Sequence, residues 1–293
     1  MRVLLTGATG FIGKYLWKYL KENTSNKIYG LSRRANSEDM IPCDYSIEEL
    51  TEIFASLQIE VIIHLAAVRG KNNGIRQFQE NEILTENILL AMKHSCVKHI
   101  IFMSSIAVYS DTTKIPWKEN QVIAPKTCYG ITKAACEYLI QLYAKDEVYS
   151  YTILRIAQVL GLEETHAGMM NIFLNQAYKK DEIKVIGKSE AKREFVYIED
   201  IAASVEKIIN GYSAYSGVYN LGSMEAYTNL EIAQMINSVF ENSKLTYQNN
   251  IPENIESSLM DSTKLYHSME YQPTSLKTAL KKICAEMRAK DDL

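Results

Sequence analysis

The chain has 293 residues, 47% of them hydrophobic, which is enough for one large domain or two closely packed ones. Its formal net charge is only −3, from 32 basic and 35 acidic residues. No long run of lysine or arginine forms the basic patch of a nucleic-acid-binding protein, and no segment reaches the ~18 apolar residues of a membrane span, so we expect neither partner.

The five cysteines are odd in number, and no pair has CxxC spacing. No two histidines have the i, i+4 spacing of metal ligands on a helix, so we expect no metal site. The first residues include three glycines and lack the cleavage pattern of a signal peptide. We therefore expect reduced thiols and a cytoplasmic protein.

The first half of the chain alternates short β-branched runs with longer stretches of helical periodicity. Strands are predicted at 3–7, 27–32, 61–67, 99–105 and 151–157. Helices are predicted at 12–22, 47–56, 79–94 and 131–144. This alternation predicts an α/β fold with a doubly wound parallel sheet of the Rossmann type.

The pattern loosens after Gly161 into a polar stretch and shorter units. These units are IKVIG at 183–187, a run at 193–209, GVYNLGS at 217–223 and a final helix at 276–289. We expect a dinucleotide-binding domain over 1–161 with returning elements at about 195–222. The remainder, about 162–194 and 223–293, is expected to form a smaller C-terminal α/β substrate lobe.

A glycine-rich turn, TGATGFIG, separates the first predicted strand from the first predicted helix. Gly7 permits a tight turn, Gly10 lets the backbone approach a pyrophosphate, and Gly13 allows the helix to pack on the strand. The N-terminus of the helix then supplies N–H groups and a positive dipole. The turn therefore predicts dinucleotide binding, although its spacing is GxxGxxG rather than GxGxxG.

The next predicted strand ends at two arginines, Arg33 and Arg34, and Arg33 stands 20 residues after Gly13. An acid in this place would bind the ribose 2′-hydroxyl of NAD, whereas arginine can pair with a 2′-phosphate. The sequence therefore favours NADP, with NAD as the alternative if the arginines only solvate a loop. Asp44, followed by Tyr45, either accepts a hydrogen bond from adenine or forms an Asx turn.

The types and positions of three residues predict the reaction chemistry of the site. Tyr129 and Lys133 are four apart at the start of a helical pattern, so they share a face, and the ammonium favours the phenolate form. Ser105 ends the predicted strand 99–105, where ligands of open α/β sheets collect. A hydroxyl there can bind the substrate oxygen beside Tyr129, which predicts general acid–base catalysis.

The sequence resembles the extended short-chain dehydrogenase/reductase family, in its NAD-dependent epimerase/dehydratase branch that modifies nucleotide sugars. The resemblance rests on TGATGFIG (6–13), HLAA (64–67), SSIAVYS (104–110), YGITK (129–133) and REFVYIEDIA (193–202). It implies that Lys133 also touches the nicotinamide ribose. It also implies a homodimer formed through two helices of each subunit.

From the motifs above and from what the resemblance implies, the expected cofactor contacts are Gly7, Thr9, Gly10, Phe11, Ile12, Gly13, Ser32, Arg33, Arg34, Asp44, Tyr45, Leu65, Ala66, Ala67, Asn81, Tyr129, Lys133 and Ile156. On the same grounds, with Gln158 and Arg193 implied by the resemblance, the expected substrate contacts are Val68, Arg69, Ser105, Ile106, Gln158 and Arg193. For Arg193 the alternative is a solvated surface charge.

The residues after Ser105 narrow the reaction. Ile106-Ala107 stands where the family's 4,6-dehydratases usually carry Asp-Glu, and Ala107 replaces the cysteine of fucose-synthase-type 3,5-epimerases. We therefore expect NADPH-dependent reduction of a nucleotide-linked 4-keto-6-deoxy sugar in deoxysugar biosynthesis. The alternatives are an NAD-dependent 4-epimerase of the UDP-glucose or UDP-N-acetylglucosamine type, and a cofactor-sensing protein without turnover.

Overall fold

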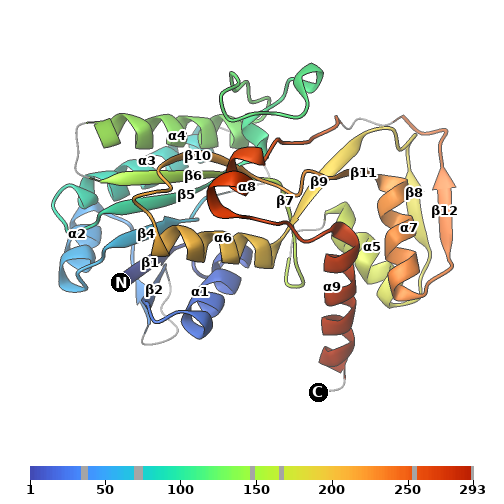
Figure 1. The fold of residues 1–293 in the computed structure, drawn as a ribbon, viewed down its shortest axis with the longest axis horizontal. Helices are drawn as coiled ribbons and strands as arrows, with labels where there is room; N and C mark the ends of the chain where they lie inside the picture. Colours follow the sequence, from blue (N-terminus) through green and yellow to red (C-terminus); the bar gives the residue numbers. More distant parts are fainter. Residues whose placement is uncertain (34–38, 69–74, 146–148, 165–167, 253–255, 292–293) are drawn as a thin grey trace.

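The computed structural model describes residues 1–33, 39–68, 75–145, 149–164, 168–252 and 256–291. Its centre is a parallel seven-stranded sheet in the order β10-β6-β5-β4-β1-β2-β3 (Figure 1). The strands are β1 (Arg2–Thr6), β2 (Lys27–Ser32), β3 (Met40–Pro42), β4 (Val61–His64), β5 (His99–Ser105), β6 (Ser150–Ile156) and β10 (Gly217–Leu221). The chain winds outward in both directions from β1 and β4, which confirms the predicted α/β fold with a Rossmann-type sheet.

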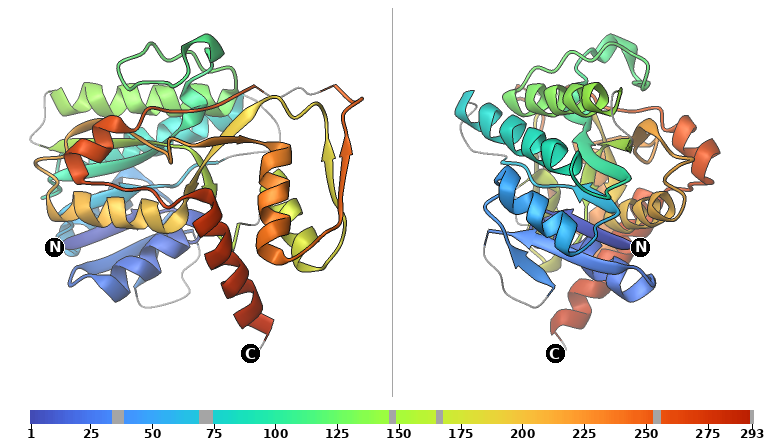
Figure 2. Two further views of the ribbon diagram at one scale, coloured as in Figure 1. Left: turned by 45° about the vertical axis from the view of Figure 1, so that its right-hand side comes forward. Right: turned by 90° about the vertical axis from the view of Figure 1, so that its left-hand side faces the viewer.

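Helices cover both faces of this sheet, because alternate side chains of each strand point to opposite sides. On β1, Leu4 packs in a cluster with α2 (Ile47–Ser56), α3 (Ile75–Met92) and α4 (Cys128–Lys145). Val3 and Leu5 pack in a second cluster with α1 (Phe11–Asn23), α6 (Ile198–Asn210) and α8 (Thr263–Met269). The right-hand view of Figure 2 shows the sheet edge-on between these two layers.

Among the other described residues, two smaller sheets and three α-helices lie beside the carboxyl ends of the large sheet (Figure 1). The three-stranded sheet has the order β11-β9-β7, and the two-stranded sheet pairs β12 with β8. These elements are β7 (Gln158–Leu160), β8 (Ile183–Ile186), β9 (Lys192–Tyr197), β11 (Ala226–Thr228), β12 (Leu245–Gln248), α5 (Met169–Tyr178), α7 (Asn229–Phe240) and α9 (Leu276–Asp291). A third apolar cluster, including Phe173, Ile236 and Leu280, forms their core.

The chain passes between the two parts several times. β9 belongs to the three-stranded sheet, whereas β10 returns to the edge of the large one. Met260 and Leu265, far along the sequence, pack in the same cluster as Val3 and Leu5. Over the residues that the structure describes, no helix combines the length and the apolar composition needed to cross a membrane.

A buried carboxylate joins these crossing segments. Glu194 of β9 accepts hydrogen bonds from the backbone N–H groups of Met224, at 2.8 Å, and Met260, at 2.9 Å. A Cβ atom on Gly222 would lie 2.2 Å from Oε1 of Glu194, so only glycine leaves room for this carboxylate. Burial raises the pKa of Glu194 to about 7, against the hydrogen bonds that lower it.

Candidate active site

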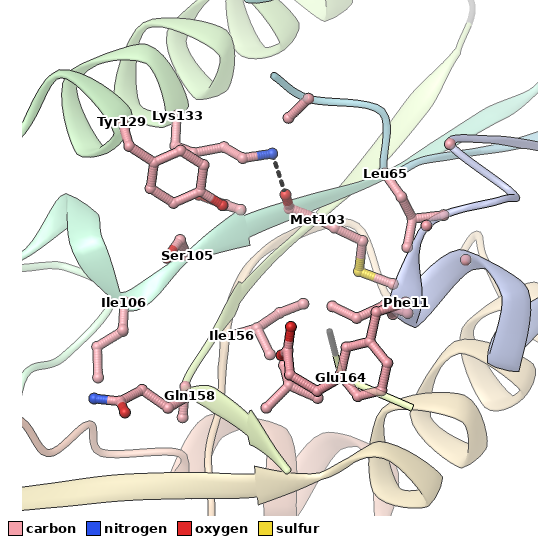
Figure 3. A pocket seen from close by; sticks show the side chains of 18 residues that line it. Phe11, Leu65, Met103, Ser105, Ile106, Tyr129, Lys133, Ile156, Gln158 and Glu164 are labelled. Carbon is pink, nitrogen blue, oxygen red and sulfur yellow. Dashed lines mark hydrogen bonds between the residues drawn. The ribbon is translucent and has the colours of Figure 1, made fainter. Parts of the chain in front are cut away.

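Two adjoining cavities lie at the carboxyl ends of the large sheet, where parallel α/β folds bind their ligands. They share four wall residues and thus form one groove, namely Gly7, Gly10, Leu65 and Ala67. We call the part that contains Ser105, Tyr129 and Lys133 the inner cavity, and the part that contains Ser32 and Arg33 the outer groove. Figure 3 shows the inner cavity.

The glycine turn has the geometry that close approach of a ligand requires. Gly7 has φ +68°, in the left-handed region, and a Cβ atom on it would lie 2.8 Å from the backbone nitrogen of Ala66. A Cβ on Gly13 would lie 2.1 Å from the carbonyl oxygen of Gly7. No side chain caps α1, whose N-cap is Gly10, so its N-terminus faces the groove with its N–H groups and positive dipole. These residues fit the pyrophosphate of a dinucleotide.

A chain of buried hydrogen bonds supports the groove wall after β4. The Ala66 N–H donates to Oγ1 of Thr6, which lies 2.8 Å from Nδ1 of His64. Nε2 of His64 lies 3.1 Å from Oγ1 of Thr85. Burial, together with the charge of Lys133, lowers the pKa of His64 to about 3, so the imidazole is neutral. Its role is therefore to support the groove wall through hydrogen bonds, and not to transfer protons.

Asn81 supports the same wall from behind. Its Oδ1 accepts a hydrogen bond from the Val68 N–H at 2.7 Å, and its Nδ2 donates to the Val68 carbonyl oxygen at 3.0 Å. The side chain is buried and is not among the described residues that line either cavity. Although we expected Asn81 to contact the cofactor, both ends of its amide hold the backbone of Val68, which lines the outer groove.

The outer groove contains most of the residues predicted to bind the adenosine half of the cofactor. Thr9, Ser32, Arg33, Asp44 and Tyr45 line it, and the Arg33 side chain is exposed. Oδ1 of Asp44 accepts a hydrogen bond from the Ser46 N–H at 2.7 Å, which is an Asx turn and lowers the pKa of Asp44. Asp44 thus makes the turn while also facing the groove. The predicted contact Arg34 lies outside the described residues.

Ser105, Tyr129 and Lys133 meet at the inner cavity (Figure 3). Ser105 ends β5, and its Oγ accepts a hydrogen bond from the Ala107 N–H at 3.2 Å. The Lys133 side chain is buried, and its Nζ lies 5.9 Å from the centre of the Tyr129 ring. This arrangement places a hydroxyl, a phenol and a cation around one space, the set that proton transfer to a carbonyl oxygen needs.

Gly130 allows α4 to bring Tyr129 this close to β5. The short helix η1 (Ile106–Val108) follows Ser105, and a Cβ on Gly130 would lie 2.2 Å from the carbonyl oxygen of Ala107. Any larger residue would push the start of α4 away from η1. Glycine after Tyr129 is therefore part of the geometry of the site.

Besides Ser105, the predicted substrate contacts fall into four groups. Ile106 and Gln158 line the inner cavity, and Val68 lines the outer groove. Arg193 lies on β9 opposite Tyr227 of β11 and is not among the described residues that line either cavity. Arg69 lies outside the described residues.

The predicted cofactor contacts Phe11, Ile12 and Ile156 also line the inner cavity, and Ala66 lines the outer groove. The sequence reasoning missed Met103 and Ser104, which the rule for carboxyl ends of strands could have found. It also missed Glu164, whose side chain lies beside Phe11 and Ile156 in Figure 3. Glu164 follows a strand by several loop residues, so no periodic pattern marks it.

Comparisons with known proteins match this chain to one family. The model of the NAD dependent epimerase/dehydratase family matches residues 3–222. A putative UDP-glucose 4-epimerase from Methanocaldococcus jannaschii is 32% identical over 68% of this chain and 70% of its own length. The dTDP-4-dehydro-6-deoxyglucose reductase of Escherichia coli is 25% identical over 98% of both chains. The crystal structure of UDP-N-acetylglucosamine 4-epimerase from Bacillus cereus is 34% identical, covers 98% of this chain and 99% of its own, and superposes with a TM-score of 0.92.

Proposed function

The chain belongs to the NAD-dependent epimerase/dehydratase family of extended short-chain dehydrogenases/reductases, as its motifs predicted, and we propose that it is an NADPH-dependent 4-ketoreductase. Its substrate in this proposal is a nucleotide-linked 4-keto-6-deoxy sugar. The family comprises NAD(P)-dependent enzymes that epimerise, dehydrate or reduce nucleotide sugars. The finer assignment rests on the residues of the groove.

The observation that carries the choice of cofactor is Arg33. It follows β2 on the rim of the outer groove, where a carboxylate would bind the ribose 2′-hydroxyl of NAD. A guanidinium there would pair with a 2′-phosphate through two parallel hydrogen bonds. A reductase must exchange its cofactor in every cycle, so NADP fits a reductase better than an epimerase.

Residues of this chain would bind the cofactor and transfer the proton. The N-terminus of α1, with Gly7 and Gly10, would hold the pyrophosphate, and Lys133 would hold the nicotinamide ribose. A bound nicotinamide dinucleotide supplies the hydride. Tyr129 donates its proton to the carbonyl oxygen at C4 of the sugar, and Ser105 donates a hydrogen bond to the same oxygen. The ammonium of Lys133 lowers the cost of forming the phenolate.

The residues beside Ser105 support reduction over dehydration. The inner cavity presents Ile106 where elimination of water would need an acid or a base. Glu164 is the carboxylate among the described lining residues, and it lies at the other end of the cavity, near Phe11 (Figure 3). We therefore assign the proton transfer to Tyr129.

The direct test supplies NADPH and a nucleotide-linked 4-keto-6-deoxyhexose, made in place by a separate 4,6-dehydratase. We expect loss of absorbance at 340 nm and a sugar nucleotide heavier by two hydrogens. Assays with dTDP-, UDP- and GDP-linked substrates identify the nucleotide. If no such substrate is reduced while NADPH binds, the sensor alternative replaces the reductase.

One observation favours a 4-epimerase as the second candidate, namely the 34% identity and TM-score of 0.92 to the Bacillus cereus UDP-N-acetylglucosamine 4-epimerase. An epimerase returns the hydride and gains from keeping one NAD bound. The purified protein would then release NAD on denaturation and interconvert UDP-N-acetylglucosamine and UDP-N-acetylgalactosamine without added cofactor. This result would replace the reductase assignment with that of an epimerase, and the proposed roles of Ser105, Tyr129 and Lys133 would stay unchanged.

We also propose that the protein forms a homodimer through α3 and α4. These helices pack side by side, and among their described side chains three large apolar ones are more than half exposed, Ile83, Tyr138 and Leu142. They line a shallow surface groove. Sedimentation should show a dimer for the wild type and a monomer for Leu142→Glu, because the new charge would be buried against the second copy.

The five cysteines are all free, which fits a reducing compartment such as the cytoplasm.

A further inference from the structure

A buried ion pair lies directly behind the inner cavity. Arg155 of β6 and Glu137 of α4 have side chains that are 6% and 1% exposed. Nε of Arg155 lies 3.1 Å from both carboxylate oxygens, and Nη2 donates to Oε2 at 2.7 Å. Although burial alone would lower it, the pKa of Arg155 is raised, because Glu137 binds and faces the guanidinium. The guanidinium of Arg155 therefore stays charged.

The pair is joined to the site through neighbouring positions. Ser104 is among the residues that line the inner cavity and precedes Ser105, and its hydroxyl donates a hydrogen bond to Oε1 of Glu137. Along α4, Glu137 follows Lys133 by one turn, and Lys133 follows Tyr129 by one turn, so all three lie on one face of the helix. Glu137 is thus one helical turn from Lys133, and Arg155 directly precedes Ile156; Lys133 and Ile156 both line the cavity.

The network continues away from the cavity. Nη1 of Arg155 donates to the Tyr109 hydroxyl at 2.7 Å and to the Glu119 carbonyl oxygen at 3.2 Å. The Tyr109 hydroxyl donates to Oδ1 of Asn220, on β10, at 2.9 Å. The pair therefore links α4 to three adjacent strands, β5, β6 and β10.

Stability alone is a poor explanation for such a pair. Taking two charges out of water costs about as much free energy as their attraction returns, and well-packed apolar residues often serve as well. Removing only one partner leaves an uncompensated charge in a medium of low dielectric constant. Near Tyr129 and Lys133 that charge would act on a proton-transfer site.

We propose that Glu137 and Arg155 are positioning residues of the active site. They hold α4 against the ends of β5 and β6, and the electrostatic effects of their opposite charges on the Tyr129 phenol largely cancel. The proposal rests on the proposed function in that it takes Tyr129 as the proton donor. It goes beyond that function in assigning a role to two residues that touch neither substrate nor cofactor.

The test compares two single variants of nearly unchanged size, Glu137→Gln and Arg155→Met. In Glu137→Gln the remaining guanidinium favours the phenolate, so the pKa of Tyr129 should fall. In Arg155→Met the remaining carboxylate disfavours it, so the pKa should rise. Glu137 follows Tyr129 by eight residues, about 12 Å along the helix, and Arg155 is bonded to Glu137, so at an effective dielectric constant near ~20 each shift should be about one pH unit.

The readout uses the free protein and needs no substrate. NMR of protein labelled at Cζ of tyrosine follows the phenol through a pH titration, and the resonance missing from Tyr129→Phe identifies Tyr129. The midpoint of kcat/KM against pH should move in the same direction wherever a substrate has been found. If the wild type turns over no sugar nucleotide, the proposed function fails, whereas the titration still decides this inference.

Two controls separate charge balance from loss of structure. Asp200→Asn alters another buried carboxyl group, which binds Thr274 at 2.7 Å and 2.9 Å, and should cost stability without moving the Tyr129 titration. The double variant Glu137→Leu/Arg155→Met restores neutrality, so its phenol should titrate within a few tenths of a unit of the wild type. Single-variant shifts that are absent, or that have the same sign, overturn the proposal.

Conservative variants cover the case in which a single variant does not fold. Glu137→Asp and Arg155→Lys keep both charges but change the geometry of the pair. We expect the Tyr129 midpoint to be unchanged and kcat to fall about tenfold with KM unchanged, because groups that act only in the transition state are displaced. An unchanged kcat in both would overturn the positioning role.

Discussion

Nζ of Lys133 lies 2.7 Å from the carbonyl oxygen of Met103 and donates a hydrogen bond to it (Figure 3). This bond joins α4 to β5 inside the cavity and holds the ammonium near the Tyr129 ring. Lys133→Ala should therefore weaken NADPH binding and also lower kcat, because one cation serves both the cofactor and the phenol. Fluorescence titration and steady-state kinetics measure the two effects. A loss of rate with normal affinity would show that Lys133 does not hold the cofactor.

Tyr129→Phe removes the proton donor and leaves the rest of the cavity in place. We expect kcat to fall at least ~100-fold with nearly unchanged NADPH affinity, the signature of a lost general acid. Tyr138→Phe, on the same helix but not among the described residues that line the inner cavity, is the matched control and should keep full activity. Turnover close to normal in Tyr129→Phe would remove the phenol from the mechanism.

Arg33→Ala removes the guanidinium at the rim of the outer groove. NADPH binding should weaken about tenfold or more, since a bidentate bond to the 2′-phosphate is lost, while NADH binding stays the same or improves. Lys14→Ala, a substitution on the exposed face of α1, should alter neither affinity. A wild-type preference for NADH would contradict the argument from Arg33 and put the epimerase first.

Gly130→Ala tests the close packing of α4 on η1. Its Cβ would meet the backbone oxygen of Ala107 at 2.2 Å, and a backbone atom cannot move aside alone. We expect a loss of about 1–3 kcal/mol in the free energy of unfolding and a lower kcat, because Tyr129 is the neighbouring residue. In the control Gly168→Ser, no heavy atom lies within 4 Å of the added Cβ, and serine suits this N-cap position. Equal stability of the two variants would mean that Gly130 is not required for packing.

Glu194 makes stability depend on pH. Its pKa is about 7 in the folded protein against an ordinary value of 4.5, so its contribution to the free energy of unfolding is fully present below pH 4.5 and is lost as the pH rises through 7. Relative to Glu194→Gln, the wild type should lose about 3 kcal/mol between pH 4.5 and pH 8. Urea unfolding at several pH values measures this difference.

The control for Glu194 is Glu163→Gln at the surface. Hydrogen bonds from Lys14 and Lys290 lower the pKa of Glu163, so its contribution is lost only as the pH falls below its ordinary range. Wild type and Glu163→Gln should therefore differ by a constant amount above pH 5. A constant difference for Glu194→Gln as well would show that Glu194 does not titrate near 7.

Much of the fold was open to prediction because its signals are local. The helix 47–56 has a serine N-cap, Ser46, whose side chain accepts from the Glu49 N–H, and its bounds agree with the prediction. The helix α7 was missed although Thr228 and Glu231 form a capping box that the sequence displays. The helix α8 has only seven residues, Thr263–Met269, too few for a periodic pattern.

The candidate site was open to prediction where a backbone motif implies its own placement. Gly7, Ser105 and Lys133 lie on the groove because strand ends and helix starts of a parallel sheet meet there. Asn81 could not be placed in this way, since a buried amide on a helix binds either a ligand or the backbone, and only the packing of the helix against Val68 decides. Glu164 lies in a loop, whose position depends on distant segments.

The close approach of Gly222 to Glu194 constrains how this chain can change over evolutionary time. A side chain at position 222 would collide with a carboxylate that two backbone N–H groups hold in place. An alanine can be accepted there only after residue 194 has become shorter, so the order of the two substitutions matters. The fitness effect of one position depends on the other, and aligned relatives should show 194 and 222 changing together, with the change at 194 the older on each branch.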